Sequence, residues 1–253
     1  MTNKVRIFQH MFVDRKLSRF ELHGLCGALV HHSRIDEPVP ASKFVKPVPE
    51  KRFRLRKIPQ EPVIKLAKTC HVEDFFDTGR LQLGSFEYYN AYDHSEIGDA
   101  NEGVVTLLAK TPFGVQGGKY GGGYNNRVFC TFVGEVDSVV LKKFGYDSGI
   151  LITQPDEFAR SIANSIGARD FTYGRCLYRK HKAVLGFPGR EVERGQLSAR
   201  CVEIVKSGKY FIKNDRYAHQ KEFRFLWEME DDVADASIFD CRAARQFCRP
   251  LEI

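Results

Sequence analysis

Residues 219–227, His-Gln-Lys-Glu-Phe-Arg-Phe-Leu-Trp, constrain the fold of this chain more than any other stretch. Their apolar and aromatic content is typical of a β-strand, in which successive side chains point to opposite faces. Phe223, Phe225 and Trp227 would share one face, which needs a hydrophobic core to cover it. The other face would carry Gln220, Glu222, Arg224 and Leu226. We interpret this polar face either as a solvated surface or as the wall of a binding site.

The composition is that of a folded protein with an anionic partner. The 253 residues are 43% hydrophobic and carry a net charge of +7, with an isoelectric point near 9.0. This balance favours a nucleic acid or a phosphorylated ligand. No run of about 18 apolar residues occurs, so no membrane association is expected. The beginning of the chain lacks the apolar core of a secretory signal, and we expect a cytoplasmic protein.

The seven cysteines indicate reduced thiols rather than a disulfide framework. They are odd in number and scattered, and no C-x-x-C pair occurs among them. This usage is typical of an intracellular protein. The histidines include no H-E-x-x-H motif, and the sequence predicts no dedicated metal site.

Residues 1–60 differ from the rest and are interpreted as a basic, proline-rich N-terminal extension. Six prolines between residues 38 and 62 oppose regular structure and predict an extended arm or linker. Within it lies a basic cluster with interleaved Phe53 and Leu55, in which phosphate contacts are assigned to Lys51, Arg52, Arg54 and Arg56. The alternative is an ordinary solvated strand held by the two apolar residues.

Residues 61–253 predict a strand-rich α+β domain with few, short helices. Strands are expected at residues 62–67, 80–84, 127–133, 149–152, 176–184, 201–206, 219–227 and 238–241. Helices are expected at residues 71–76, 138–144 and 155–166, each followed closely by a glycine. Residues 85–103 show neither period and are interpreted as a functional loop. The glycine-rich residues 117–126 lack the P-loop spacing and are interpreted as a mobile flap or a hairpin tip.

Taken in order, these motifs resemble a broad prokaryotic family of domains of unknown function related to ADP-ribosyltransferases. The likeness covers residues 60–230 as an order of motifs. The first half of that order is a strand at 63–67, the Asp77-Thr78-Gly79 turn, a strand at 81–84, and Tyr88-Tyr89 running into residues 98–103. The second half is the strand at 128–132, the strand and helix at 149–166, and Lys213 followed by residues 220–224.

The resemblance implies a split two-sheet α+β fold that holds NAD, with three site elements. The first-strand position, an Arg or His in such transferases, is nearest to Lys65 or Lys68 here, which departs from the family pattern. Thr131 takes the position of a small hydroxyl residue on the central strand. Glu222, with Gln220 as its helper, takes the position of the catalytic glutamate. The remaining NAD contacts are assigned to Tyr88, Tyr89, Tyr120 and Arg224.

These residue types suit cleavage of the bond between nicotinamide and ribose. That step builds oxocarbenium character at the sugar, which a nearby carboxylate stabilises while it binds the ribose 2′-hydroxyl. The expected function is therefore NAD-dependent ADP-ribosyl transfer to an intracellular acceptor such as RNA or DNA, by a toxin or antiviral-defence effector that an antitoxin protein accompanies. If Arg224 merely neutralises Glu222, the site is structural.

Two other functions remain open at this point. One is a non-catalytic basic module that binds nucleic acid on the same scaffold. The other is a metal-dependent nuclease built on four acidic residues of a single loop, namely Asp93, Glu96, Asp99 and Glu102.

Overall fold

The computed structural model describes residues 4–9, 38–40, 48–49, 58–91, 102–111, 114–136, 138–186 and 209–251. The chain divides into two compact units, which we describe separately. The smaller unit comprises residues 1–54, 103–122 and 177–216. The larger unit comprises residues 55–102, 123–176 and 217–253. The expected basic cluster at residues 51–56 lies outside the described residues, as does most of the predicted extension.

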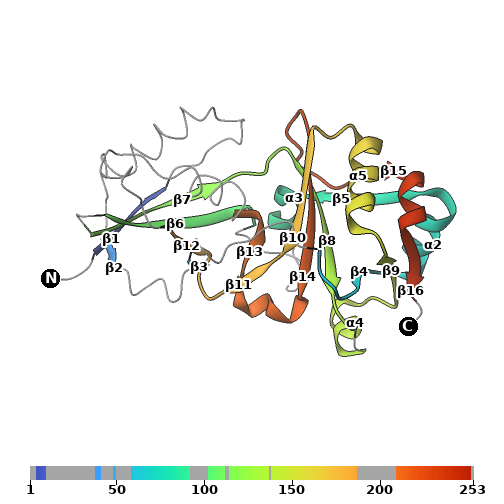
Figure 1. Ribbon diagram of the computed structural model, residues 1–253, viewed down its shortest axis with the longest axis horizontal. Coiled ribbons are helices and arrows are strands. Elements are labelled where there is room, and N and C mark those ends of the chain that lie inside the picture. Colours follow the sequence, from blue (N-terminus) through green and yellow to red (C-terminus); the bar gives the residue numbers. More distant parts are fainter. Residues whose placement is uncertain are drawn as a thin grey trace. The chain divides into compact units, whose positions relative to one another are not determined.

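The larger unit is built on an antiparallel sheet in the order β10-β14-β8-β4-β9-β16, in which β5 also pairs with β8 (Figure 1). Its strands are β10 (Asp170–Arg175), β14 (Glu222–Glu228), β8 (Asn126–Val133), β4 (Val63–Ala67), β9 (Ser148–Ile152), β16 (Cys248–Leu251) and β5 (Arg80–Ser85). The short strand β15 (Ser237–Asp240) extends the sheet beyond β5. β8 and β14 pair along their whole lengths, from Phe132 opposite Glu222 to Asn126 opposite Glu228.

The sheet forks at β8, because two different strands share the edge of β8 that faces away from β14. β4 pairs with the end of β8, at Val133 and Phe132. β5 pairs with its beginning, at Val128 and Arg127. Cys130 lies between these two pairings, at the fork.

The helices expected at residues 138–144 and 155–166 have the predicted bounds, whereas the one expected at 71–76 spans Thr69–Thr78. Helix α5 (Pro155–Ile166) has a proline in its first turn, together with two acidic residues that interact favourably with the positive end of the helix dipole. Its C-terminal cap is Gly167, whose φ is +67°. Helix α2 (Thr69–Thr78) ends at Gly79, whose φ is +82°. Helix α4 (Ser138–Phe144) is followed by Gly145 at φ +67°. Left-handed backbone of this kind favours glycine because it has no Cβ.

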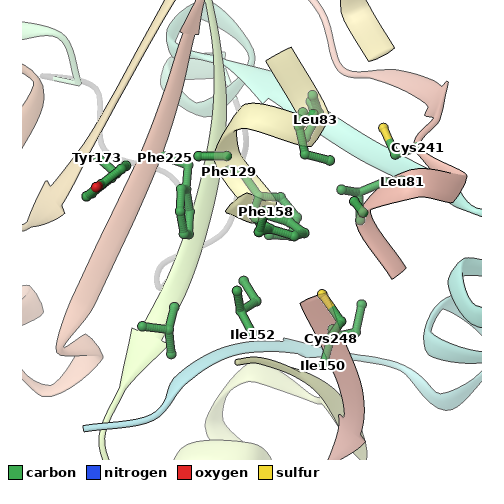
Figure 2. Close-up of a cluster of buried hydrophobic side chains, with 14 of the residues drawn as sticks. Leu81, Leu83, Phe129, Ile150, Ile152, Phe158, Tyr173, Phe225, Cys241 and Cys248 are labelled. Atoms are coloured by element: carbon green, nitrogen blue, oxygen red, sulfur yellow. The ribbon is translucent and has the colours of Figure 1, made fainter. Parts of the chain in front are cut away.

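The main core lies on one face of the sheet, beneath α5 and α2. Figure 2 shows Phe129 of β8, Phe158 of α5 and Phe225 of β14 gathered in it, with Leu81 and Leu83 of β5 nearby. The ring centroid of Phe158 is 5.9 Å from that of Phe129 and 5.4 Å from that of Phe225. Trp227 also lies on this face, and its indole N–H donates to the carbonyl oxygen of Ala159 at 2.8 Å. The aromatic face of residues 223–227 is therefore buried, as its alternation predicted.

The smaller unit contains a second sheet, in the order β2-β1-β7-β6-β12-β3. Its strands are β2 (Pro38–Pro40), β1 (Lys4–Gln9), β7 (Gly114–Gly121), β6 (Val104–Thr111), β12 (Ala183–Gly186) and β3 (Val48–Pro49). The same unit contains a separate, two-stranded parallel sheet. It pairs β11 (Leu177–Arg179) with β13 (Ile212–Asn214). β1 pairs with β7, so this part of the predicted extension belongs to a sheet.

The prediction of a strand-rich α+β fold with few, short helices is confirmed, and the structure adds that the larger unit is built on a large antiparallel sheet. Four local predictions were wrong, and the strand expected at residues 201–206 lies outside the described residues. The strand expected at 176–184 is interrupted, and the separate strands β11 and β12 form in its place. The glycines at 117, 118 and 121 form part of β7, where β6 and β1 on either side supply backbone partners, and not a flap. Residues 86–91 form helix α3 (Phe86–Ala91) within the predicted loop. The predicted strand at 219–227 begins only at Glu222, because η3 (Asp215–Gln220) is a 3-10 helix.

Within the described ranges, no helix combines the length and apolar character that crossing a bilayer requires.

Candidate functional site

A buried ionic network joins Arg224 to two glutamates in the larger unit. Arg224 Nε donates to Glu222 Oε1 at 2.7 Å, and Arg224 Nη2 lies 2.6 Å from the same oxygen. On its other side, Nη1 donates to Glu102 Oε2 at 2.8 Å and Nη2 to Glu102 Oε1 at 3.1 Å. The exposed fractions are 1% for Arg224, 4% for Glu102 and 5% for Glu222. A guanidinium is suited to this role because its planar fork can serve two carboxylates at once.

Strand alternation places the first two members of this network. Glu222 and Arg224 are two residues apart on β14, so both point away from the face that carries Phe223 and Phe225. Glu102 arrives from a distant part of the sequence, and its backbone N–H donates to Asn90 Oδ1 at 3.0 Å. The guanidinium also lies over the ring of Phe86, 5.5 Å from its centroid. α3 therefore supplies two of the contacts that hold the network in place.

The network keeps Arg224 charged. Burial alone lowers the pKa of this guanidinium, but Glu102 and Glu222 more than compensate, and the pKa of Arg224 lies well above its ordinary value. One cation between two carboxylates leaves a formal charge of −1 if both are ionised. Removal of Arg224 would leave two buried carboxylates without their cation, whereas removal of either glutamate would leave a neutral ion pair.

Lys65 supplies a second cation, at the fork of the sheet. Its ammonium donates to the carbonyl oxygen of Cys130 at 3.1 Å and lies 4.9 Å from the centroid of the Phe129 ring. It thus occupies the gap between β4 and β5, where a continuous neighbouring strand would have donated a backbone N–H. Burial lowers the pKa of Lys65, while Cys130 and Glu222 oppose this shift. The attraction to Glu222 places the ammonium within electrostatic range of the ionic network.

Tyr89 of α3 lies in the same region. Burial raises the pKa of its phenol well above the ordinary value, and Cys130 and Glu222 raise it further, against the effect of Arg224. Its ring packs against β5 at Gly84, where a Cβ would approach Tyr89 Cε2 to 2.8 Å. The Tyr88 ring meets the Tyr89 ring edge to face, with centroids 5.3 Å apart. Gly84 is therefore required by the close approach of this ring to the strand.

Among the predicted site residues, the structure brings Glu222, Arg224 and Tyr89 together on one face of the sheet. Lys65 starts from the opposite face, because Ile64 before it pairs with Phe132, which faces the same way as Glu222, and only the Lys65 ammonium reaches the fork. Thr131 also lies on that opposite face. Thr131 pairs with Phe223 across β8 and β14, so its side chain lies on the face opposite to Glu222, and its hydroxyl donates to the Phe223 carbonyl oxygen at 2.6 Å. The expected role of Thr131 as an NAD contact beside Glu222 is inconsistent with this position.

Gln220 does not share a strand face with Glu222. It is the buried last residue of η3, and Lys221 follows it with φ at +40°, an uncommon value for a non-glycine residue. The chain therefore turns between Gln220 and Glu222, and the two-residue spacing does not by itself aim both side chains the same way. Tyr120 lies on β7 in the smaller unit.

Glu102 belongs to the ionic network, although the sequence suggested it only as part of the acidic loop in the alternative of a metal-dependent nuclease. Both of its carboxylate oxygens accept hydrogen bonds from Arg224. Asp93, Glu96 and Asp99 lie outside the described residues. In the part of the chain that the structure describes, no cluster of three or more His, Cys, Asp or Glu side chains suits a metal ion. No local signal in the sequence links Glu102 to Arg224, which is 122 positions away.

Comparison with known proteins gave no matching family model, no matching curated protein and no matching solved structure.

Proposed function

We propose that this protein is an NAD-dependent ADP-ribosyltransferase in which Glu222 is the catalytic carboxylate. The proposal includes a split two-sheet fold of the transferase type over residues 61–253, and an intracellular acceptor that the enzyme modifies as a toxin or antiviral-defence effector, with an antitoxin as its partner. One observation carries it most directly. Glu222 stands at the first position of β14, oriented by Arg224, with Lys65 and Tyr89 within electrostatic range at a fork in the sheet.

The chemistry assigns a role to each of these groups. The bond between ribose C1′ and the nicotinamide nitrogen breaks, and its electron pair leaves with neutral nicotinamide. The Glu222 carboxylate stabilises the oxocarbenium character at C1′ and accepts a hydrogen bond from the ribose 2′-hydroxyl. The acceptor nucleophile then bonds to C1′ and loses its proton to solvent. Arg224 holds the carboxylate in one orientation, which replaces the phosphate contact expected from the sequence.

Lys65 is the candidate for the cationic position on the first strand. It lies on β4 and its ammonium occupies the fork. In this assignment Lys65 offsets the negative charge of the carboxylates and attracts the pyrophosphate of NAD. Tyr89 is the candidate for the aromatic contact with nicotinamide, because its phenol lies within electrostatic range of Glu222 and Arg224.

The burial of Glu222 sets a requirement for this mechanism. With 5% of the residue exposed, NAD must displace neighbouring side chains before its ribose can contact the carboxylate. We expect α3 to shift when NAD binds, since Phe86 and Tyr89 of α3 lie against Arg224 and β5.

The competing function is a non-catalytic module in which the same network is structural. The observation that favours it is the two-sided pairing of Arg224, because a buried arginine that serves two carboxylates satisfies its own hydrogen bonds without any substrate. The geometry of the network thus fits both the transferase and the non-catalytic module. A measurement of ADP-ribosyl transfer distinguishes the two.

The decisive experiment is transfer of label from NAD that carries the label in its ADP-ribose part. The wild-type protein is incubated with labelled NAD and with total RNA, DNA or cell lysate. Transfer that is lost in Glu222→Gln and retained in Glu102→Gln supports the proposal, because both variants remove one carboxylate charge from Arg224. The absence of both NAD binding and transfer in the wild-type protein would favour the structural module.

A further inference from the structure

The charge of the protein is divided unequally between its two units. The smaller unit has 23 Lys and Arg against nine Asp and Glu, a net charge of +14. The larger unit has 16 against 23, a net charge of −7. The overall charge of +7 therefore conceals a strongly basic unit attached to an acidic one. Asymmetry of this kind indicates a polyanionic partner for the basic unit.

The described residues of the smaller unit include an exposed basic cluster. It arises at the ends of the parallel strands β11 and β13, where Arg179 is paired with Asn214. Because the strands are parallel, the residues that follow them emerge at the same edge. Lys180 follows β11 and Arg216 comes shortly after β13, and both are exposed. Basic residues from two distant segments therefore meet at one edge.

Asn214 fixes this arrangement with both ends of its side-chain amide. Its Nδ2 donates to the backbone oxygen of Lys180 at 3.0 Å, and its Oδ1 accepts from the backbone N–H of Arg216 at 3.1 Å. Lys182, two residues beyond Lys180, is half-buried, and Asp215 is the one exposed acidic residue next to Arg216. We call Lys180, Lys182 and Arg216 the basic edge.

We propose that the smaller unit binds the phosphodiester backbone of a nucleic acid, and that the basic edge contributes to this contact. If the protein is the proposed transferase, this nucleic acid is its acceptor. Only the role of the nucleic acid as acceptor rests on the proposed function, and the binding itself does not. A phosphate backbone suits the observations because the excess charge is spread over three chain segments, and a long polyanion can contact all of them.

An anionic membrane is the other extended polyanion, and the structure favours it less. Peripheral membrane binding commonly uses an amphipathic helix with a basic face. The elements described in the smaller unit are strands, apart from the turn of helix at residues 209–211 and the first residues of η3. A sheet edge that carries dispersed lysines and arginines is better suited to a phosphate backbone.

The test uses the full chain and two triple variants of equal charge. The first, Lys180→Gln with Lys182→Gln and Arg216→Gln, neutralises the basic edge. The second, Arg80→Gln with Lys142→Gln and Arg249→Gln, removes the same charge from exposed positions of the larger unit. Fluorescence anisotropy measures the binding of labelled 20-nucleotide single-stranded RNA, the corresponding DNA, and duplex DNA between 50 and 200 mM salt.

We expect the wild-type protein to bind at least one of these oligonucleotides with a strong salt dependence. The basic-edge variant should bind about tenfold more weakly and lower the slope of log Kd against log salt by about 2, because each lost phosphate contact removes about 0.7 to 0.9 from it. The larger-unit variant should bind within about twofold of the wild-type protein, since a polyanion does not contact its acidic unit. The three oligonucleotide arms identify which nucleic acid is preferred.

The inference is overturned if the two triple variants weaken binding equally, if neither does, or if the wild-type protein binds only vesicles rich in phosphatidylserine. Both triple variants should retain the wild-type circular dichroism spectrum, because all six positions are at least partly exposed. These measurements need no NAD. If the oligonucleotide-binding test fails, the proposed transferase would act on a protein acceptor. If the protein instead shows no transferase activity, the result of the binding test still stands.

Discussion

The guanidinium of Arg224 holds the carboxylate of Glu222, two residues earlier on the same strand, through Nε at 2.7 Å and Nη2 at 2.6 Å. Paired residues on one strand face can form such a contact without any help from the rest of the fold. What makes this pair unusual is its burial, because desolvated charges are costly unless each finds a partner. Glu102 provides the second partner, and the network thus ties the sheet to the segment that follows α3.

The first prediction concerns catalysis. Glu222→Gln should lower the rate of ADP-ribosyl transfer by about 100- to 1000-fold, because an amide cannot stabilise positive charge at C1′ as a carboxylate does. Single-turnover transfer of label from NAD measures this rate. Glu102→Gln is the matched control and should keep most of the activity. Equal losses in both variants would mean that the network acts on activity only through folding.

The second prediction concerns stability. Arg224→Met should lower the free energy of unfolding by about 3 to 5 kcal/mol, because it leaves two buried carboxylates without their cation. Urea denaturation followed by circular dichroism measures the change. The control is Arg175→Met, which breaks the exposed ion pair with Glu61 and should cost at most about 1 kcal/mol. Similar costs in the two variants would contradict the structural importance of the buried network.

The third prediction tests the packing of α3 against β5. Gly84→Ala should lower the free energy of unfolding by about 1 to 3 kcal/mol, because the new methyl group would lie 2.8 Å from Tyr89 Cε2. In a Tyr89→Ala background the same substitution should cost far less, since the ring that it meets is gone. A double-mutant cycle measures this coupling. Additive effects would show that Tyr89 does not pack on Gly84.

The fourth prediction concerns alkaline pH. Burial raises the pKa of Cys241 and of Cys248 from 9.0 to about 12, so both thiols stay protonated in the folded protein where they ionise in the unfolded chain. Their contribution to stability is complete below pH 9 and is lost as the pH rises from 9 toward 12. At pH 10 the loss should reach about 1.4 kcal/mol for each thiol.

Urea denaturation under reducing conditions between pH 7 and 11 checks this dependence. The Cys248→Ala variant should be less stable at pH 7, because it leaves a cavity, but its stability should fall less steeply above pH 9. Cys70→Ala is the control, since Cys70 is exposed, and its pH dependence should match that of the wild-type protein. Parallel curves for all three proteins would show that the buried thiols do not cause the alkaline loss.

Local signals in the sequence predicted much of the larger unit. The strand at residues 63–67 begins one residue after its predicted start, and the helices at 138–144 and 155–166 begin and end as expected. These predictions succeeded because the signals are local: apolar periodicity, proline at a helix start and glycine at a helix end. The glycine-rich residues 117–121 failed for the opposite reason, since only the partner strands β1 and β6 make them a strand.

In the candidate site, too, some features follow from local sequence signals and others depend on the tertiary structure. The sequence alone determined that Glu222 and Arg224 share a strand face opposite Phe223 and Phe225, because alternation is a property of the backbone. Only the tertiary structure decided that Thr131 faces away from them, that Lys65 occupies the fork of the sheet, and that Glu102 completes the network. Those positions depend on strand register and on contacts between residues far apart in the chain, and no local pattern of residues encodes either.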